Sequence, residues 1–439
     1  MMHTIDLRGR TLTHSELLGL VPRSTTDVSA AMAIAEQLIA AVRATGEAAL
    51  LDQAEQLDGV RPASILVPIS EIHKAVAALQ PDVRDALEEA ISRVRAASNA
   101  QLPTRTATSL GDGAEVLQRW VPMSRVGLYV PGGKAVYPSS VVMNVVPAQV
   151  AGVPSIAIAS PAQREFGGSV HPTVLGAAGL LGIDEVYAMG GAGAIGALAY
   201  GVPDIGLEPV QLITGPGNVY VAAAKRLVRG QAGIDAEAGP TEILVIADGQ
   251  ANPVFVAADL ISQAEHDELA AAVLVTNSAA FADLVREALT TLVPRTAHQT
   301  RVVEALSGQQ SAIVLVDDLA AAAAFSNAYG PEHLELQIAD ADAMIDLIES
   351  AGAIFVGENS PVSLGDYLAG SNHVLPTGGQ ARFSSGLGTY TFLRPQQVIH
   401  YSRSALDGVA ARIVALATAE DLPAHAAAVT VRFAGPASR

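Results

Sequence analysis

The chain has 439 residues, of which half are hydrophobic and only 4% aromatic, and it carries a formal charge of −18 at pH 7. This length predicts two or three domains with ample core, and the Ala-, Gly- and Val-rich composition is typical of a closely packed α/β protein. The negative charge argues against nucleic acid or an anionic membrane as a partner, because both would repel an acidic surface. No apolar run is long enough to span a bilayer and the N-terminus lacks the apolar core of a secretory signal, so we expect a cytoplasmic protein.

The chain contains no cysteine. Disulfides, thiolate metal sites and a thiohemiacetal intermediate are therefore excluded. If an aldehyde is oxidised here, it must react as a hydrate formed by water, with a base to activate that water.

The first hundred residues predict helices that lead into strands. Residues 25–100 are expected to be helical, because apolar positions between Ala31 and Leu51 recur at helical spacing and Pro81 separates two further segments. Residues 115–130 are rich in β-formers and predict a hairpin that leads into Pro131-Gly132-Gly133.

An alternation of strands and helices follows. Short buried-strand patterns lie at 156–159, 185–189 and 210–214, and a second series lies at 242–247, 272–276, 312–316, 334–338 and 353–356. Two such series predict two parallel sheets with helices on both faces. The alternation ends near residue 383, and helical patterns at 404–418 and 421–431 close the chain.

The expected fold class is therefore α/β, with two Rossmann-like parallel-sheet α/β domains, a helical N-terminal segment and a small C-terminal appendage. The expected divisions are an N-terminal arm at 1–24, a first α/β domain at 25–128 plus 237–382, a second at 129–236, and a C-terminal segment at 383–439.

Glu332 and His333 form an adjacent carboxylate–imidazole pair after Gly330-Pro331. Such a pair offers two proton-transfer groups of different basicity in one place. The alternative is an exposed dipeptide without a role, which is common.

Two glycine-rich turns end predicted strands. Gly191-Ala-Gly193-Ala-Ile-Gly196 matches the GxGxxG pattern of dinucleotide sites, but the acidic residue expected after the next strand is missing, and close helix–strand packing explains the match equally well. Gly215-Pro-Gly217-Asn218 is either a tight turn or a ligand loop at the carboxyl edge of a sheet. Tyr129 precedes a third such turn, where its ring either stacks on a planar ligand or caps the core.

Several polar side chains remain open to two interpretations. Gln263 and His266 share one face of a predicted helix end, which either begins a metal site or is a solvated polar end. Asp366 and His373 lie seven residues apart in a stretch expected to be a loop, and His425 lies at the start of the last predicted helix.

Nine short motifs follow one another along the chain: YVPGG, GGAxAI, GPGN, AGPTE, SQAEH, GPEHLEL, GDYLAGSNHVLPT, ARFSSGL and LPAH. In this order they resemble the histidinol dehydrogenase family, and the resemblance extends from about residue 20 to residue 433. The resemblance implies a zinc-dependent, NAD-linked four-electron oxidation of L-histidinol to L-histidine through L-histidinaldehyde, the last two steps of histidine biosynthesis. It also implies a homodimer in which the C-terminal segment crosses over, so that Glu420 and His425 serve the partner's site.

The resemblance further assigns residue roles. The implied zinc ligands are Gln263, His266, Asp366 and His425. The implied catalytic pair is Glu332 and His333. Substrate contacts fall on Thr241, His373 and Glu420, together with His333 and the four zinc ligands. NAD contacts fall on Tyr129, Gly193 and Asn218.

The chain departs from the family pattern at two positions. Gly193 stands where the family usually has Gln, so the GxGxxG match is created by a replacement and a side chain that would touch NAD is removed. Thr241 stands where Ser is usual, which keeps the hydroxyl.

Three other functions stay open. A relative on the same scaffold could oxidise another polar alcohol, such as a sulfonated diol, although His373 and Glu420 favour histidinol because an imidazole and an ammonium group need such partners. A zinc hydrolase could use Gln263, His266 and Asp366 with Glu332 as base, and would need no nucleotide. A catalytically silent binding protein is the third.

Overall fold

The computed structural model describes residues 2–24, 28–132, 136–237 and 239–434. Within these ranges the chain forms two compact units. The first unit comprises Met1–Gln101 and Met123–Phe392, and the second comprises Leu102–Pro122 and Leu393–Arg439. The chain leaves the first unit after Gln101, returns to it at Met123, and enters the second unit again at Leu393.

A six-stranded parallel sheet lies in the first unit, with the order β1-β11-β10-β9-β12-β13. Its strands are β1 (His3–Asp6), β9 (Glu242–Ala247), β10 (Ala271–Thr276), β11 (Ala312–Leu315), β12 (His333–Gln337) and β13 (Ala353–Val356). The central strands are apolar on both faces, as expected for strands covered by helices on both sides.

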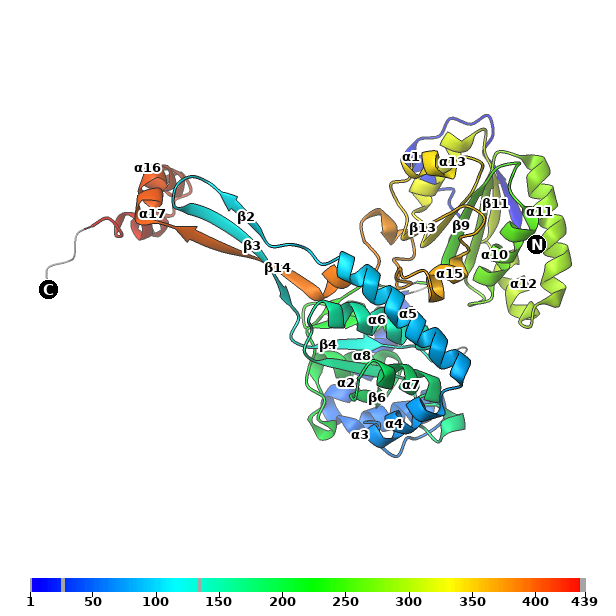
Figure 1. The fold of residues 1–439 in the computed structure, drawn as a ribbon, viewed down its shortest axis with the longest axis horizontal. Coiled ribbons are helices and arrows are strands. Elements are labelled where there is room, and N and C mark those ends of the chain that lie inside the picture. Colours follow the sequence, from blue (N-terminus) through cyan, green and yellow to red (C-terminus); the bar gives the residue numbers. More distant parts are fainter. Residues whose placement is uncertain (1, 25–27, 133–135, 238, 435–439) are drawn as a thin grey trace. The chain divides into compact units, whose positions relative to one another are not determined.

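Two groups of helices cover this sheet (Figure 1). Helices α10 (Pro253–Ala264), α11 (Ala279–Leu292) and α12 (Gln299–Ser307) pack on the face of Ile243 and Val245. Helices α1 (His14–Leu18) and α13 (Leu319–Tyr329) pack on the face of Leu244 and Ile246. Two short helices, α14 (Ala341–Ile345) and α15 (Val362–Tyr367), follow β12 and β13. The expected N-terminal arm is therefore part of this layer, because β1 extends the sheet and α1 covers it.

A five-stranded parallel sheet in the same unit has the order β6-β5-β4-β7-β8. Its strands are β4 (Val126–Tyr129), β5 (Ile156–Ser160), β6 (Val186–Ala188), β7 (Leu212–Thr214) and β8 (Gly233–Ile234). The helices between them are α6 (Pro138–Val150), α7 (Pro172–Leu180), α8 (Gly191–Tyr200) and α9 (Val219–Val228). Two parallel α/β sheets are thus present, as the strand patterns predict.

The N-terminal helices pack differently from the expected divisions. These are α2 (Val28–Thr45), α3 (Glu47–Gln53), α4 (Ile69–Ala78) and α5 (Pro81–Ala100). Helix α2 packs on α8 and α9, α4 on α7, and α5 on α6. The segment expected with residues 237–382 therefore covers the five-stranded sheet, because its apolar face matches the Ala-rich surface of α8 and α9.

The hairpin expected at 115–130 is wrong. Strand β3 (Ala114–Pro122) pairs antiparallel with β2 (Thr106–Ser109) and with β14 (Leu393–Tyr401), whereas β4 is a parallel strand of the five-stranded sheet. Burial separates the two strands: all four residues of β4 are buried, whereas β3 has only Ala114 and Leu117 buried and most of its other residues are half-buried. Strand β14 lies in the stretch where no strand is expected from the sequence.

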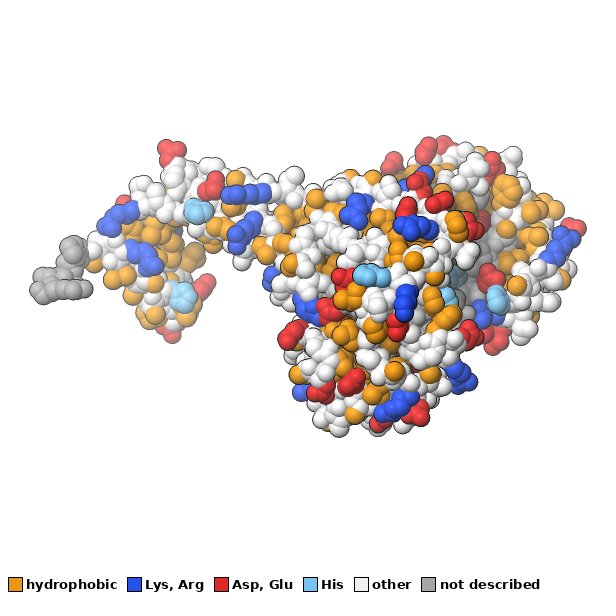
Figure 2. All heavy atoms as spheres, turned by 60° about the horizontal axis from the view of Figure 1, so that its bottom comes forward, with side chains coloured by type: hydrophobic (Ala, Val, Ile, Leu, Met, Phe, Trp, Pro, Cys, Tyr) orange, Lys and Arg blue, Asp and Glu red, His pale blue; other side chains and the backbone are white. Residues whose placement is uncertain are grey.

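The second unit consists of this three-stranded sheet with α16 (Arg403–Ala419) and α17 (Pro423–Thr430), which match the two helical patterns of the C-terminal segment. Hydrophobic side chains lie on its surface (Figure 2), including Ile399, Leu416 and Val431, each about two-thirds exposed. Lys and Arg are scattered among Asp and Glu in the same view. No helix in the described part of the chain is both long and apolar enough to cross a membrane.

Candidate active site at the amino edge of the six-stranded sheet

Glu332 and His333 lie where β12 begins, next to the beginning of β9. Gly330 ends α13 in a left-handed conformation, Pro331 follows, and His333 is the first residue of β12. The side chains are only 6% and 5% exposed, respectively. The pair is therefore a buried feature of the sheet edge, which excludes the alternative of an exposed dipeptide.

The Glu332 carboxyl group is held by the start of β9. Its Oε2 accepts hydrogen bonds from Thr241 Oγ1 at 2.5 Å and from the backbone N–H of Glu242 at 2.9 Å. Burial raises the pKa of Glu332 to about 8, and these two hydrogen bonds oppose the rise. A carboxyl group that titrates near neutral pH can both take and return a proton within one catalytic cycle.

The His333 imidazole is held in one tautomer. Its Nδ1 lies 3.1 Å from the backbone oxygen of Glu242, and a carbonyl oxygen only accepts, so Nδ1 carries the hydrogen. Burial lowers the pKa of His333, which keeps the ring neutral at pH 7. No residue in the described part of the chain bonds to Nε2, whose lone pair is free to accept a proton.

An ion pair of the buried Glu242 side chain stabilises the arrangement of Glu332 and His333. The Glu242 carboxylate pairs with Arg23, at 2.8 Å between Oε2 and Nη1, and accepts a hydrogen bond from the backbone N–H of Gly378. Burial raises the pKa of Glu242, and the charge of Arg23 opposes the rise. Because the Glu242 backbone contacts the side chains of both Glu332 and His333, the Arg23 pair fixes the strand end that positions them.

Gln263 and His266 lie at the C-terminal end of α10. Gln263 is 2% exposed, and its Nε2 donates to Thr241 Oγ1 at 2.7 Å, which leaves Oε1 buried without a partner. His266 is exposed, with Nδ1 at 3.2 Å and 3.3 Å from the backbone oxygens of Ser262 and Gln263, so Nδ1 donates and Nε2 keeps its lone pair. An orphaned carbonyl oxygen and a free imidazole nitrogen are donors that suit Zn²⁺. The interpretation as a solvated polar helix end is therefore wrong for Gln263.

Asp366 and His373 complete this part of the site. Asp366 lies in the last turn of α15 rather than in a loop, and its backbone oxygen accepts from His373 Nδ1 at 2.9 Å. Burial lowers the pKa of His373, while the Asp366 carboxylate opposes the fall for both His373 and His333. His373 Nε2 accepts from Ser140 Oγ at 3.1 Å. Ser140 belongs to the first turn of α6, so the five-stranded sheet contributes to the site through a residue that no sequence motif indicated.

The expected metal ligands do not all lie in one unit. Among the described residues, no three His, Cys, Asp or Glu side chains converge as a metal-binding group. The expected set contains only two such residues in the first unit, His266 and Asp366, because the third ligand there is Gln263. Glu420 ends α16 and His425 lies in the first turn of α17; both are exposed residues of the second unit.

The expected NAD residues gather at the opposite edge of the other sheet. Tyr129 ends β4, is 3% exposed, and accepts a hydrogen bond at its hydroxyl from the backbone N–H of Gly191 at 3.1 Å. Asn218 caps α9 by accepting from the backbone N–H groups of Tyr220 and Val221. All three expected positions, including Gly193 in the first turn of α8, therefore lie at the carboxyl edge of the five-stranded sheet. Gly133 of the YVPGG motif lies outside the described residues.

Gly193 stands where the family usually has Gln, and the side chain of Gln53 packs closely against it. A Cβ atom at Gly193 would come within 1.9 Å of Oε1 of Gln53, at the end of α3. Gln53 Nε2 donates to the backbone oxygen of Leu38 at 3.0 Å, and Oε1 is buried without a partner. The side chain of Gln53 thus occupies the space that a larger residue at 193 would need.

The GxGxxG match does not have the position of a Rossmann fingerprint. It follows β6, the third strand of the five-stranded sheet in chain order, which lies at the edge of that sheet. The fingerprint belongs after the first strand, which here is β4 with its Pro131-Gly132 turn. Another glycine is required at the point where the strand order reverses: Gly215 has φ +110°, and a Cβ there would lie 2.0 Å from the backbone oxygen of Tyr129.

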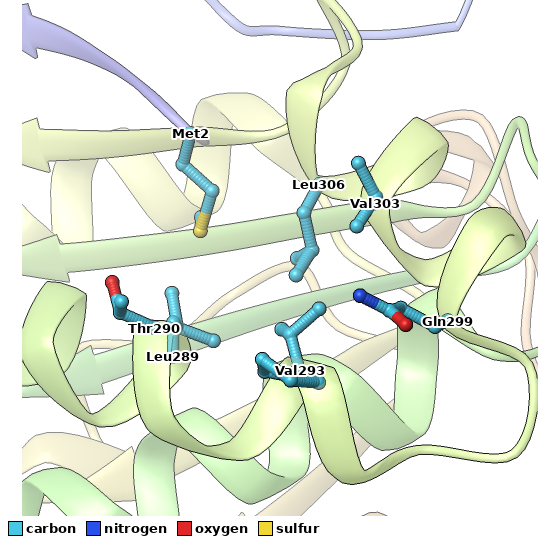
Figure 3. Close-up of a pocket in the computed structure, with 8 residues that line it drawn as sticks. Met2, Leu289, Thr290, Val293, Gln299, Val303 and Leu306 are labelled. Carbon is cyan, nitrogen blue, oxygen red and sulfur yellow. The ribbon is translucent and has the colours of Figure 1, made fainter.

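An apolar cavity of about 230 Å³ lies apart from all these residues. Figure 3 shows its lining: Met2, Leu289, Thr290, Val293, Pro294, Gln299, Val303 and Leu306. The lining contains no titratable side chain, so the cavity offers no acid–base chemistry.

The comparison with known proteins agrees with this geometry. A family model described as histidinol dehydrogenase matches residues 21–433. The chain belongs to the histidinol dehydrogenase family. A histidinol dehydrogenase from Leifsonia xyli subsp. xyli is 70% identical over 98% of this chain and 99% of the relative, and one from Corynebacterium diphtheriae is 55% identical over 99% and 98%. The crystal structure of a histidinol dehydrogenase from Elizabethkingia anophelis superposes with a TM-score of 0.91 at 33% identity, covering 98% of both chains. The recognition from sequence motifs and the α/β fold class are confirmed.

Proposed function

We propose that this chain oxidises L-histidinol to L-histidine through L-histidinaldehyde in two NAD⁺-linked steps and that it requires zinc. The observation that carries the proposal is the pairing of a neutral imidazole, whose Nε2 is free, with a carboxyl group whose pKa is raised to about 8. Membership of the histidinol dehydrogenase family supplies the substrate. The absence of cysteine leaves hydration of the aldehyde as the route to the acid.

The residues present fit a zinc ion. Gln263 Oε1 is an orphaned buried acceptor, His266 presents Nε2, and the Asp366 carboxylate carries the negative charge. These three residues would hold the metal together with His425 from a second copy of the chain. Zinc would supply a positive charge that orients the imidazole and amine of the substrate.

The first oxidation uses His333 as the base. Nε2 takes the proton of the substrate hydroxyl while the carbon gives a hydride to NAD⁺, so that the alcohol becomes an aldehyde and one NADH forms. The Nδ1–H bond to the Glu242 oxygen keeps the ring oriented as it becomes positively charged. Tyr129, the backbone around Gly193, and Asn218 lie where the cofactor would bind.

The second oxidation begins with water. Glu332 takes a proton from a water molecule as the water oxygen bonds to the aldehyde carbon, and the protonated His333 returns its proton to the carbonyl oxygen, which gives the hydrate and a neutral His333. His333 then takes a proton from the hydrate while its carbon gives a second hydride to NAD⁺, and the carboxylic acid and a second NADH result. Thr241 holds Glu332 in place throughout, and His373 and Glu420 are proposed to contact the substrate's polar groups.

We also propose a homodimer in which the second unit of one copy completes the site of the other. Its apolar residues Ile399, Leu416 and Val431 are about two-thirds exposed, and such surfaces are typical of association sites. A mixture of His266→Ala and His425→Ala proteins should regain activity, because one of the two shared sites then has all its ligands. Absence of any recovery after subunit exchange would show that each site is built from one chain.

The test of the proposed function is the amount of NADH formed per L-histidinol consumed, before and after removal of metal with a chelator. Two NADH per substrate, lost with the chelator and restored by zinc, is the expected result. A folded, zinc-loaded protein that forms no NADH from L-histidinol would reject this substrate and direct the search to other polar alcohols, such as a sulfonated diol. If it also failed to bind NAD⁺, hydrolysis would become the better proposal.

A further inference from the structure

The Asp58 carboxylate lies near the proposed cofactor residues. It is the last residue of a π-helical turn, Ala54–Asp58, that continues α3, and Gly59 then turns the chain in a left-handed conformation. Asp58 is half-buried, and none of the residues that the structure describes bonds to its side chain. Two neighbours on the same segment differ: Asp52 and Glu55 are exposed and pair with Arg61 at 2.6 Å and 3.0 Å. Burial raises the pKa of Asp58 to about 6.

The chain after Asp58 runs across the carboxyl edge of the five-stranded sheet. Arg164, four residues beyond the end of β5, donates from Nε to the backbone oxygen of Gly59 at 3.1 Å. Ala188, the end of β6, donates to the backbone oxygen of Ile65 at 2.7 Å. Burial raises the pKa of Tyr129, at the end of β4, to about 12, and the negative charge of Asp58 adds to the rise. The segment that begins at Asp58 therefore lies along the ends of β5 and β6, and Asp58 itself lies near Tyr129 at the end of β4.

The strand order gives this position a meaning. The five strands follow the order third, second, first, fourth, fifth, so the order reverses between β4 and β7. In such sheets a dinucleotide lies across the reversal, with the adenosine ribose on the side of the second strand, where an Asp or Glu accepts hydrogen bonds from the ribose hydroxyls. Here the second strand, β5, ends in Ser160-Pro161-Ala162-Gln163, without a carboxylate. Asp58 reaches the same edge from the helical segment that precedes the sheet.

We propose that Asp58 binds the ribose hydroxyls in the adenosine half of the cofactor and makes the site select NAD⁺ over NADP⁺. This inference rests on the proposed NAD-linked function. A carboxylate accepts both hydrogen bonds of a ribose diol, whereas the 2′-phosphate of NADP⁺ would place a second anion beside it. The exposed guanidinium of Arg164 on Gly59 is the group that a 2′-phosphate would contact once the carboxylate is removed.

Titration calorimetry with NAD⁺ and NADP⁺, on the full-length zinc-loaded protein without substrate, tests the proposal. The Asp58→Asn variant should bind NAD⁺ about 10- to 100-fold more weakly, as expected for loss of a charged acceptor. Its preference for NAD⁺ over NADP⁺ should fall by about tenfold or more, and a further Arg164→Ala change should remove that gain in NADP⁺ binding. The matched control is Glu55→Gln, which removes the same charge from the same turn and should bind both nucleotides within about twofold of the parent.

The outcomes separate this inference from the proposed function. If the parent binds NAD⁺ and Asp58→Asn binds both nucleotides as the parent does, the role of Asp58 is wrong while NAD dependence stands. If the parent binds neither nucleotide, both are wrong. Should Asp58→Asn fail to fold, competition on the parent decides: 5′-AMP should displace NAD⁺ at a concentration about tenfold or more below that of adenosine 2′,5′-bisphosphate, and equal potency would overturn the proposal.

Discussion

The two parallel sheets have the same strand order but place polar side chains at opposite edges. Without β1, the six-stranded sheet also runs third, second, first, fourth, fifth, with its reversal between β9 and β12. The proposed catalytic pair and the proposed zinc ligands Gln263, His266 and Asp366 lie at its amino edge, whereas the proposed cofactor residues lie at the carboxyl edge of the five-stranded sheet. A shared topology therefore does not imply a shared position of the site.

The electrostatics of helix ends explains the difference. In a parallel α/β sheet the helices run against the strands, so the amino edge gathers helix C-termini and the carboxyl edge gathers helix N-termini. Gln263 and Asp366 both come from the last turns of helices, α10 and α15, where the partial negative charge favours a cation. The turns before α8 and α9 present N–H groups to the carboxyl edge of the five-stranded sheet, which suits the phosphates of a dinucleotide. One edge thus suits a metal ion and the other an anion.

The largest expected effect comes from removing the proposed base, His333, at the amino edge of the six-stranded sheet. Replacing His333 with Ala removes the only proposed proton acceptor of both hydride steps, so NADH formation should fall by about 10²–10⁴ with L-histidinol and with supplied L-histidinaldehyde alike. Steady-state NADH absorbance measures both. A fall confined to one substrate would assign the other step to a different base.

Replacing Glu332 with Gln should separate the two steps. The amide oxygen can still accept from Thr241 and from the Glu242 N–H, but the side chain can no longer take a proton from water. We expect aldehyde oxidation to fall by about 10²-fold or more, while oxidation of the alcohol changes less. Single-turnover experiments with each substrate check this, and normal aldehyde oxidation would contradict the role of Glu332.

At the carboxyl edge of the five-stranded sheet, adding one methyl group at Gly193 should lower the stability of the protein. Gly193→Ala would drive a Cβ atom into Gln53 Oε1, and moving that side chain would break its bond to the Leu38 oxygen. We expect a loss of about 1–3 kcal/mol in the free energy of unfolding, measured by urea denaturation. Adding Gln53→Ala should relieve most of the loss. If the two changes are additive, the close packing of Gly193 on Gln53 is not what limits this position.

The last prediction concerns the pH dependence of stability and involves β12, whose first residue is His333. Glu335 in β12 is fully buried, and burial raises its pKa to about 9, with the charge of Asp259 in α10 adding to the rise. The ordinary value is 4.5, so between pH 4.5 and 9 the folded state binds more protons than the unfolded state, and stability falls as pH rises. Glu335→Gln should flatten this slope in melting temperatures measured from pH 6 to pH 9. An unchanged slope would assign the pH dependence to other groups.

Sequence patterns located most strands of both sheets because continuous apolar runs, such as 242–247 and 312–316, mark buried parallel strands. The same patterns failed where a strand pairs with a segment that is distant in the sequence. Strand β3 pairs with β14, more than 270 residues away in the sequence, so the adjacent run 126–129 was wrongly joined to it. The choice of sheet by α2–α5 likewise depends on which surface an amphipathic helix meets, which local spacing does not encode.

The site shows the same division. The i, i+3 spacing of Gln263 and His266 indicated a shared helix face, but only the packing shows that Gln263 is buried with an orphaned oxygen while His266 is exposed. The adjacency of Glu332 and His333 was plain in the sequence, yet their protonation depends on Thr241 and Glu242, some 90 residues earlier. Asp58 and Ser140 carried no motif, because each reaches its neighbours only through the fold.

The edge position of β1 has a consequence for how the chain is made. His3 to Asp6 pair with Ala312 to Leu315, so the first strand synthesised must wait for a partner about 300 residues later. At ribosomal rates of about 5–20 residues per second this is a delay of roughly 15–60 s. Arg23 likewise can form its ion pair only after Glu242 has been synthesised. The six-stranded sheet can therefore close only late in translation, after the five-stranded sheet has emerged, and the edge that carries Glu332 and His333 is among the last parts of the molecule to form.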